Sequence, residues 1–251
     1  MNREQAENVL DCALSIGEQL LISGAEVGRV EDTIRRICTA YGAERVDVFS
    51  ITSSIITTMY GESFGTCTQT RRVSSTQNDL SRIDRLNQLS RSICAELPAP
   101  AEIRTALARI DAGPRFSFRA MLLIYALISG SFSVFFGGDW MDMLASAIIG
   151  VMLKFLESLI KKGSVNALFR ALLCSIAGGF LANLSVCAGL GHHVDLICIG
   201  NVMLFIPGIA FTNSLRDMFS GDTITGLIRF CESALLAIIV ALGFTVANFI
   251  F

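Results

Sequence analysis

The uneven distribution of charge is the feature that most constrains how this chain folds. Residues 1–115 contain 13 Lys and Arg and 15 Asp and Glu, whereas residues 116–251 contain only 7 of each kind. Charged residues make up 17% of the whole chain, below the roughly one quarter that is usual in globular proteins. We therefore expect a water-exposed domain over residues 1–112 and a lipid-embedded domain over residues 113–251, separated at Gly113-Pro114.

Long apolar segments fill the C-terminal part. A helix crosses the bilayer core of about 30 Å with about 20 apolar residues. Five segments meet this requirement, at about 117–136, 140–159, 166–189, 195–214 and 228–250. Since lipid offers the backbone no hydrogen bonds, these segments are predicted to be helices. The expected fold is an α-helical integral membrane protein with five transmembrane helices, preceded by a small α+β cytoplasmic domain.

The N-terminal part shows both helical and strand periodicity. Apolar residues follow a helical spacing over about 4–23 and again after Gly24. The period changes to two over about 44–73, which predicts two or three antiparallel strands. Helical spacing returns over about 77–96 and 100–110.

The positions of Lys and Arg predict the orientation in the membrane. Lys161 and Lys162 lie between the second and third expected spans, and Arg216 and Arg229 lie between the fourth and fifth. The other two short connections contain no Lys or Arg. Because basic residues are enriched in cytoplasmic loops, we expect a cytoplasmic N-terminus and a C-terminus on the opposite side. The polar start of the chain predicts no signal peptide.

Composition also bears on which classes of function to expect. A net charge of −2 does not suggest a nucleic-acid partner. The two histidines, His192 and His193, lie in the membrane part, and the eight cysteines form no C-x-x-C pair. We therefore predict no catalytic residue, no metal site and no cofactor. A membrane scaffold and a membrane-anchored enzyme with a catalytic cytoplasmic domain are the alternatives.

A proline interrupts the fourth expected span. Pro207 lacks a backbone donor and Gly208 bends readily, so the helix is expected to break there. Transporters place substrates at such interruptions. Asn201, which precedes the break, is expected to line a translocation path.

Charged and amide side chains follow the break. They are Asn213, Arg216, Asp217, Asp222, Arg229 and Glu232. Ionisable groups in or beside a span suggest function by default. Arg216 and Arg229 suit a substrate carboxylate. The acidic residues suit an ammonium group or a coupling proton.

The N-terminal domain carries a further group of charges, Glu26, Arg29 and Glu31, on its second expected helix. An ion pair within the helix is the simpler interpretation. A contact to the membrane part is the functional one.

These stretches resemble a known family. The run from Pro207-Gly208 to Arg229 resembles the signature of the threonine/serine exporter family (ThrE), and Gly24-Ala25-Glu26 with Arg29 and Glu31 resembles its N-terminal domain. Full-length members carry two groups of spans, of which this chain has the first. It therefore resembles the YjjP-type large subunit of the split form.

The resemblance implies export of threonine and serine, or of succinate, across the bacterial inner membrane, with the N-terminus cytoplasmic and the C-terminus periplasmic. It also implies a small YjjB-like membrane subunit as partner. We expect proton coupling, and a second chain or a homo-oligomer to complete the path. The sequence does not choose among the substrates.

Overall fold

The computed structural model describes residues 1–74, 77–113, 116–163 and 165–250. The chain divides into two compact units: the first unit is Met1–Pro114 with Ile209–Cys231, and the second unit is Arg115–Gly208 with Glu232–Phe251. Pro114 of the predicted boundary lies outside the described residues, and the domain limits stay a prediction. Segment 209–231, which the apolar pattern assigned to the membrane part, belongs to the first unit.

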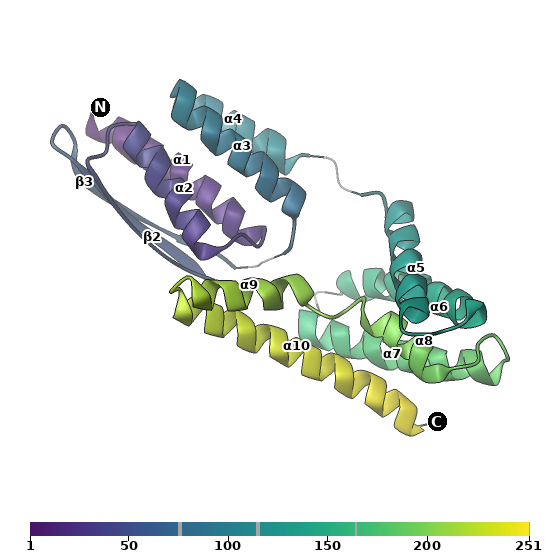
Figure 1. Cartoon of the computed structure of the whole chain (residues 1–251). Coiled ribbons are helices and arrows are strands. Elements are labelled where there is room, and N and C mark those ends of the chain that lie inside the picture. Colours follow the sequence, from purple (N-terminus) through teal and green to yellow (C-terminus); the bar gives the residue numbers. More distant parts are fainter. Residues whose placement is uncertain (75–76, 114–115, 164, 251) are drawn as a thin grey trace. The chain divides into compact units, whose positions relative to one another are not determined.

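The first unit is built on a three-stranded antiparallel sheet. Its N-terminal segment contains α1 (Arg3–Ile22), α2 (Val27–Ala40), β1 (Arg45–Ile51), β2 (Ser54–Gly61), β3 (Gly65–Arg72), α3 (Leu80–Glu96) and α4 (Pro100–Asp111). The strand order is β1-β2-β3. Figure 1 shows the sheet on one side of α1 and α2, with α3 and α4 on the other. The predicted small α+β fold with antiparallel strands is confirmed.

The core of this unit follows the two periodicities seen in the sequence. On β2, Ile55, Thr57 and Met59 are buried at every second position, as expected for a strand with one face on a core. The helices contribute large apolar side chains that are fully buried: Leu10, Leu14, Leu20, Leu21, Ile34, Ile37, Leu86, Ile93 and Ile103. This packing fixes the turn between α1 and α2, which forms part of the candidate site.

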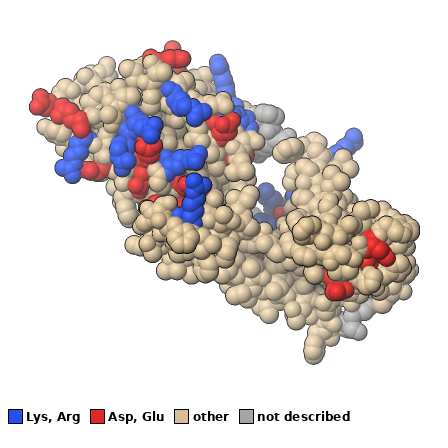
Figure 2. Space-filling view, viewed as in Figure 1, with Lys and Arg blue, Asp and Glu red and all other residues tan. Residues whose placement is uncertain are grey.

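Long apolar helices form the second unit. α5 (Phe118–Phe135), α6 (Trp140–Lys161), α7 (Ala167–Cys187) and α10 (Thr223–Ile250), most of which lies in this unit, are long and apolar enough to cross a membrane. Large apolar side chains point outward from them, among them Leu123, Leu127, Ile148, Phe155, Leu235, Ile238 and Leu242. In the view of Figure 2, charged side chains gather over the first unit and are few over the second. An apolar surface of this extent suits lipid as the solvent.

Small residues line the interior of the second unit. A Cβ on Gly243 of α10 would lie 2.5 Å from the Cβ of Ser175 on α7. The two helices therefore approach so closely that only glycine fits, as is common between membrane helices. Ala171 and Ser175, small residues one turn apart on α7, are both buried.

The fifth full-length span is not confirmed. Segment 195–214 consists of two short helices, α8 (Val194–Val202) and α9 (Gly208–Phe219). With 9 and 12 residues, they are about 14 and 18 Å long, shorter than a bilayer core of about 30 Å. The interruption lies before Pro207-Gly208, where the missing proline donor predicts it.

Candidate functional site

Within the first unit, α9 and the start of α10 pack against the turn between α1 and α2. We call residues 213–229 the α9–α10 elbow and residues 23–27 the α1–α2 turn. The elbow contains Asn213, Arg216, Asp217, Asp222 and Arg229, all singled out from the sequence. A Cβ on Gly226 would lie 2.7 Å from the carbonyl oxygen of Ser214, so glycine permits the close approach of α10 to α9.

Arg229 joins the two helices of the elbow to the α1–α2 turn. Its guanidinium donates a 2.8 Å hydrogen bond to Asp217 Oδ2 and a 3.1 Å hydrogen bond to the carbonyl oxygen of Ala25. The side chains of Arg229 and Asp217 are only 10% and 2% exposed. A buried charge pair of this kind is strongly destabilised when one partner is lost.

Asp217 also caps α2. Glu26, at the N-cap position of α2, makes no capping hydrogen bond with its own side chain. The carboxylate of Asp217 instead accepts a hydrogen bond from the backbone N–H of Val27, the first residue of the helix. A negative group at a helix N-terminus is favoured by the free N–H groups and the helix dipole. Burial nevertheless raises the pKa of Asp217, against the lowering influence of Arg229 and Val27.

Two weaker contacts surround this buried pair. Arg216 donates to Glu26 Oε1 at 2.8 Å, with the Arg216 side chain 62% exposed. Asn213 Nδ2 lies 3.4 Å from the carbonyl oxygen of Gly24. The two guanidinium groups expected to bind a substrate carboxylate thus have partners inside the protein. Polar bonds to four consecutive residues of the turn, 24–27, hold the elbow in place.

A cavity of about 430 Å³ lies beside the elbow, between Glu31, the end of β1 and Asp222. Glu31 Oε1 accepts a hydrogen bond from the backbone N–H of Ser50 at 2.8 Å. Burial, reinforced by the negative charge of Asp222, raises the pKa of Glu31. Of the three charges expected to contact the C-terminal part, Glu26 and Glu31 face the elbow, whereas Arg29 faces a groove between α2 and α3.

The remaining candidates lie in or at the edge of the second unit. Pro207 and Gly208 stand at the break before α9, and Glu232 is exposed on α10. Asn201 is fully buried on α8. Its amide accepts from Ser129 Oγ at 2.7 Å and donates to Ser146 Oγ at 3.2 Å, which links α8 to α5 and α6. Its side chain therefore has protein partners on both its oxygen and its nitrogen.

An ionisable cluster lies within the apolar helices of the second unit. Glu157 Oε2 accepts hydrogen bonds from Lys154 Nζ at 2.8 Å and from Tyr125 Oη at 2.9 Å. The Lys154 ammonium also lies 4.6 Å from the centre of the Tyr125 ring. With side chains 16% and 24% exposed, Lys154 and Glu157 are largely withdrawn from the surface. Charges inside a membrane domain are costly and mark functional sites by default.

Two His–Asp pairs join the connections at the ends of α5 and α7. Asp142 is fully buried and accepts the backbone N–H groups of His192 and His193, while its Oδ2 lies 2.8 Å from His193 Nδ1. Asp139 pairs with His192. The hydrogen bond to Asp142 raises the pKa of His193, and the N–H of Asp142 helps to lower the pKa of Asp139.

The same cluster has a composition that could hold a metal ion. Asp139, Asp142 and His193 each bring one ligand atom within 4.8 Å of the others. The carboxylate oxygens of Asp139 and Asp142 also accept hydrogen bonds from backbone N–H groups. These bonds and the two His–Asp pairs are enough to explain why the three side chains lie together. That the chain holds no metal stays a prediction.

Sequence reasoning missed Tyr125 and Asp142. Tyr125 is 32 positions from Glu157 and reaches it only because α5 packs along α6. Asp142 follows Asp139 by three residues at the start of a helix, the spacing of a capping box. That spacing was readable from the sequence, but its pairing with the histidine loop was not.

Comparison with known proteins adds independent information. Residues 11–251 match the family model for threonine/serine exporters, ThrE. The chain is 25% identical over 245 residues to a threonine/serine exporter of Corynebacterium glutamicum, covering 93% of this chain and 49% of that protein. It is 22% identical over 243 residues to a Klebsiella aerogenes protein named "probable succinate transporter subunit YjjP", covering 95% and 90%. No solved structure matches the chain.

Proposed function

The chain belongs to the threonine/serine exporter family, and on this premise we propose that it is one subunit of an inner-membrane exporter for small carboxylate-bearing metabolites. The observation that carries the proposal is the Tyr125–Lys154–Glu157 cluster inside apolar helices, in a chain that matches an exporter family over nearly its whole length. Threonine, serine and succinate, the solutes in the relatives' names, all carry a carboxylate.

A second subunit is part of this proposal. The chain spans about half of the Corynebacterium relative, and its Klebsiella relative is named as a subunit. We propose that a small YjjB-like membrane protein supplies the missing part of the path. Two copies of this chain closing the path as a homo-oligomer is the alternative arrangement.

Lys154 and Glu157 have the chemistry that the transport step needs. An ammonium group attracts a substrate carboxylate, and a carboxylate at the same place attracts an amino group or a proton. In this structure the two charges neutralise each other at 2.8 Å. We propose that substrate or proton binding separates them and that the Tyr125 hydroxyl keeps Glu157 oriented. We propose that Glu157 also carries the coupling proton.

We propose that the elbow transmits the state of the first unit to the membrane helices. Arg229 and Asp217 fix the beginning of α10 to the α1–α2 turn, and α10 continues as one helix to Ile250. A change at the turn is therefore passed along the helix. Asn213 and Arg216 support this contact, so their proposed role is positioning rather than direct contact with substrate, whereas Asp222 borders the cavity beside Glu31.

The proposed orientation has the first unit in the cytoplasm and the C-terminus in the periplasm. The basic residues Lys161, Lys162, Arg216 and Arg229 then share the cytoplasmic side, as the positive-inside rule requires. With α5, α6, α7 and α10 as full spans, we propose that the chain returns to the cytoplasm through α8 and the break at Pro207, ahead of α9. Transporters use such broken crossings next to their substrate.

The test is metabolite export from bacterial cells that lack their own exporters for these solutes. Cells expressing this chain together with the small subunit are loaded with threonine through a dipeptide or with succinate, and the intracellular amount is followed over time. We expect faster loss of at least one solute than in cells with either subunit alone. Equal loss in all strains, with both subunits present in the membrane, argues against an exporter.

A further inference from the structure

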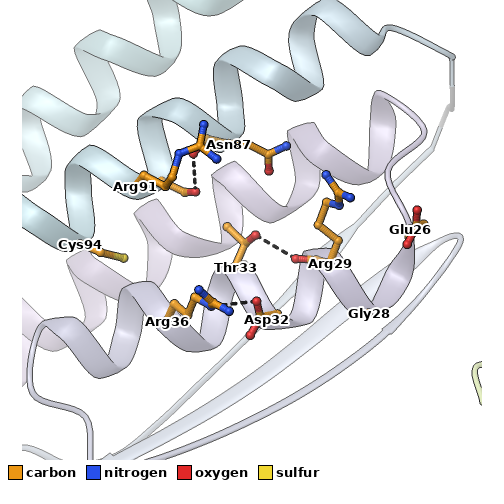
Figure 3. Close-up of a pocket in the computed structure, with 10 residues that line it drawn as sticks. Glu26, Gly28, Arg29, Asp32, Thr33, Arg36, Asn87, Arg91 and Cys94 are labelled. Atoms are coloured by element: carbon orange, nitrogen blue, oxygen red, sulfur yellow. Dashed lines mark hydrogen bonds and ion pairs between the residues drawn. The ribbon is translucent and has the colours of Figure 1, made fainter. Parts of the chain in front are cut away.

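A groove of about 600 Å³ between α2 and α3 carries arginines that the proposed function does not use. Figure 3 shows Arg29 and Thr33 on α2, with Asn87, Arg91 and Cys94 on α3 across from them. The groove belongs entirely to the first unit. Its volume lies in the usual range for sites that bind small molecules, about 300–1,000 Å³.

Some charged side chains of the groove have a partner of opposite charge, and others have none within the described part of the chain. Arg36 forms an ion pair with Asp32 at 2.8 Å, and Glu26 forms one with Arg216 at 2.8 Å. Among the residues that the structure describes, Arg29 and Arg91 form no ion pair. Two guanidinium groups without carboxylate partners therefore stand on opposite walls of the same groove.

Both arginines are exposed, and what sets them apart is that they border one groove from two different helices. Two like charges that border one space repel each other, and an anion placed between them converts the repulsion into two attractions. Guanidinium groups also present paired N–H donors that match the oxygens of a carboxylate or a phosphate. The Asn87 amide adds a neutral hydrogen-bonding group to the same wall as Arg91.

We propose that the groove binds a small dianion carrying carboxylate or phosphate groups, held by Arg29 from α2 and Arg91 from α3. This binding needs no transport and goes beyond the proposed function of the chain. Its location also suggests what binding does. Glu26 borders the groove and pairs with Arg216 of the elbow. An anion on Arg29, one helical turn from Glu26, therefore acts on a residue that holds the elbow in place.

Cys94 provides a local test, because it lines the groove and is partly buried. The full-length protein in detergent is treated with N-ethylmaleimide, and alkylation of Cys94 is timed by peptide mass spectrometry. Succinate and inorganic phosphate are the probes, and zwitterionic threonine is the comparison solute. The exposed Cys231 is the internal control.

We expect succinate, phosphate or both to slow alkylation of Cys94 saturably, while alkylation of Cys231 is unchanged. In Arg29→Gln/Arg91→Gln, the half-protecting concentration should rise by about tenfold or more, as expected when charged hydrogen bonds worth about 1.4 kcal/mol are lost. Arg72→Gln/Arg109→Gln removes the same charge from exposed arginines outside the groove and should behave as wild type. Thermal unfolding establishes that both double variants are folded.

Protection by only one probe supports the proposal and names the ligand class, a dicarboxylate or a phosphate compound. The proposal is overturned if neither probe protects Cys94 at millimolar concentration. It is also overturned if the Arg29/Arg91 variant is protected as well as wild type, or if the control variant loses protection equally. Because the readout is a local alkylation rate, failure of export in cells leaves this result unaffected.

Discussion

Arg229 of α10 and Asp217 of α9 form a buried ion pair with a hydrogen bond of 2.8 Å, and each also bonds the backbone of the α1–α2 turn. One pair of side chains thus closes the elbow and attaches it to the N-terminal helices. Its neighbour, the pair of Arg216 and Glu26, has the same length but leaves Arg216 largely exposed. The contributions of a buried and an exposed ion pair to the free energy of unfolding can therefore be compared at one contact.

Removing Asp217 should destabilise the first unit strongly. Asp217→Ala leaves the Arg229 guanidinium buried without its charge partner, which typically costs about 3–5 kcal/mol. Glu26→Gln, the matched control at the exposed pair, should cost less than about 1 kcal/mol. Denaturant unfolding of the full chain in detergent measures both. Similar costs for the two variants contradict the assignment of Asp217 and Arg229 as the main attachment.

Adding a methyl group at the crossing of α9 and α10 should open the elbow. A Cβ at position 226 would meet the Ser214 carbonyl oxygen at 2.7 Å, whereas one at Gly208 meets nothing within 4 Å. Gly226→Ala should therefore destabilise the first unit by about 1–3 kcal/mol, the usual cost of overpacking. Gly208→Ala is the matched control and should have little effect. Proteolysis rates within residues 213–229 report the opening, and equal rates in the two variants would count against it.

The junction of the two loops in the second unit should depend on pH through His193. Its pKa is raised above the ordinary value of 6.5 by its bond to Asp142, with Asp139 and Asp195 adding negative charge nearby. A raised histidine pKa means that the stabilisation is complete below pH 6.5 and is lost as pH rises through the folded-state pKa. Hydrogen exchange of the loop amides should therefore speed up as pH rises through this range, after correction for the intrinsic exchange rate.

His193→Gln should remove that pH dependence while His192→Gln retains most of it, because the pKa rise of His193 comes first from Asp142. A loop whose corrected exchange rate follows pH equally in both variants would show that another group is responsible. The same samples, titrated with Zn²⁺, check whether Asp139, Asp142 and His193 hold a metal ion.

Within the membrane helices, Lys154→Met and Glu157→Gln should each lower the efflux rate by about tenfold or more, about 1.4 kcal/mol in activation free energy. The double variant should be little worse than either single variant, because the two groups act as one unit. Lys161→Met, an exposed lysine on the same helix, is the control. Additive losses, or a loss in the control of the same size, would indicate that Lys154 and Glu157 act separately or only through folding.

Much of the architecture could be read from the sequence, because it depends on local patterns. The period-two stretch predicts the strands of residues 44–73, and unbroken apolar runs predict α5, α6, α7 and α10. The fifth span is not confirmed as one continuous helix, because hydropathy counts apolar residues without regard to their packing partners. The helical structure is interrupted just before Pro207 and resumes at Gly208. The helix that follows, α9, belongs to the first unit although its composition is compatible with lipid.

The candidate site was less predictable for the same reason. Asp217 and Arg229 were singled out as opposite charges near a span, but their partners Ala25 and Val27 lie about 200 positions earlier in the chain. A backbone partner has no sequence signature, so no pattern separates a charge that binds substrate from one that caps a distant helix. Tyr125 was missed similarly, since only packing of α5 on α6 brings it to Glu157.

Transport by the reconstituted protein is the decisive test of the proposed export function. This chain is placed in liposomes with and without the co-purified small subunit, and release of labelled threonine and labelled succinate is measured under an applied proton gradient. We expect release of at least one solute only when both subunits are present, and a lower rate in Glu157→Gln. Release no faster than from empty liposomes, with both proteins folded and inserted, would contradict it.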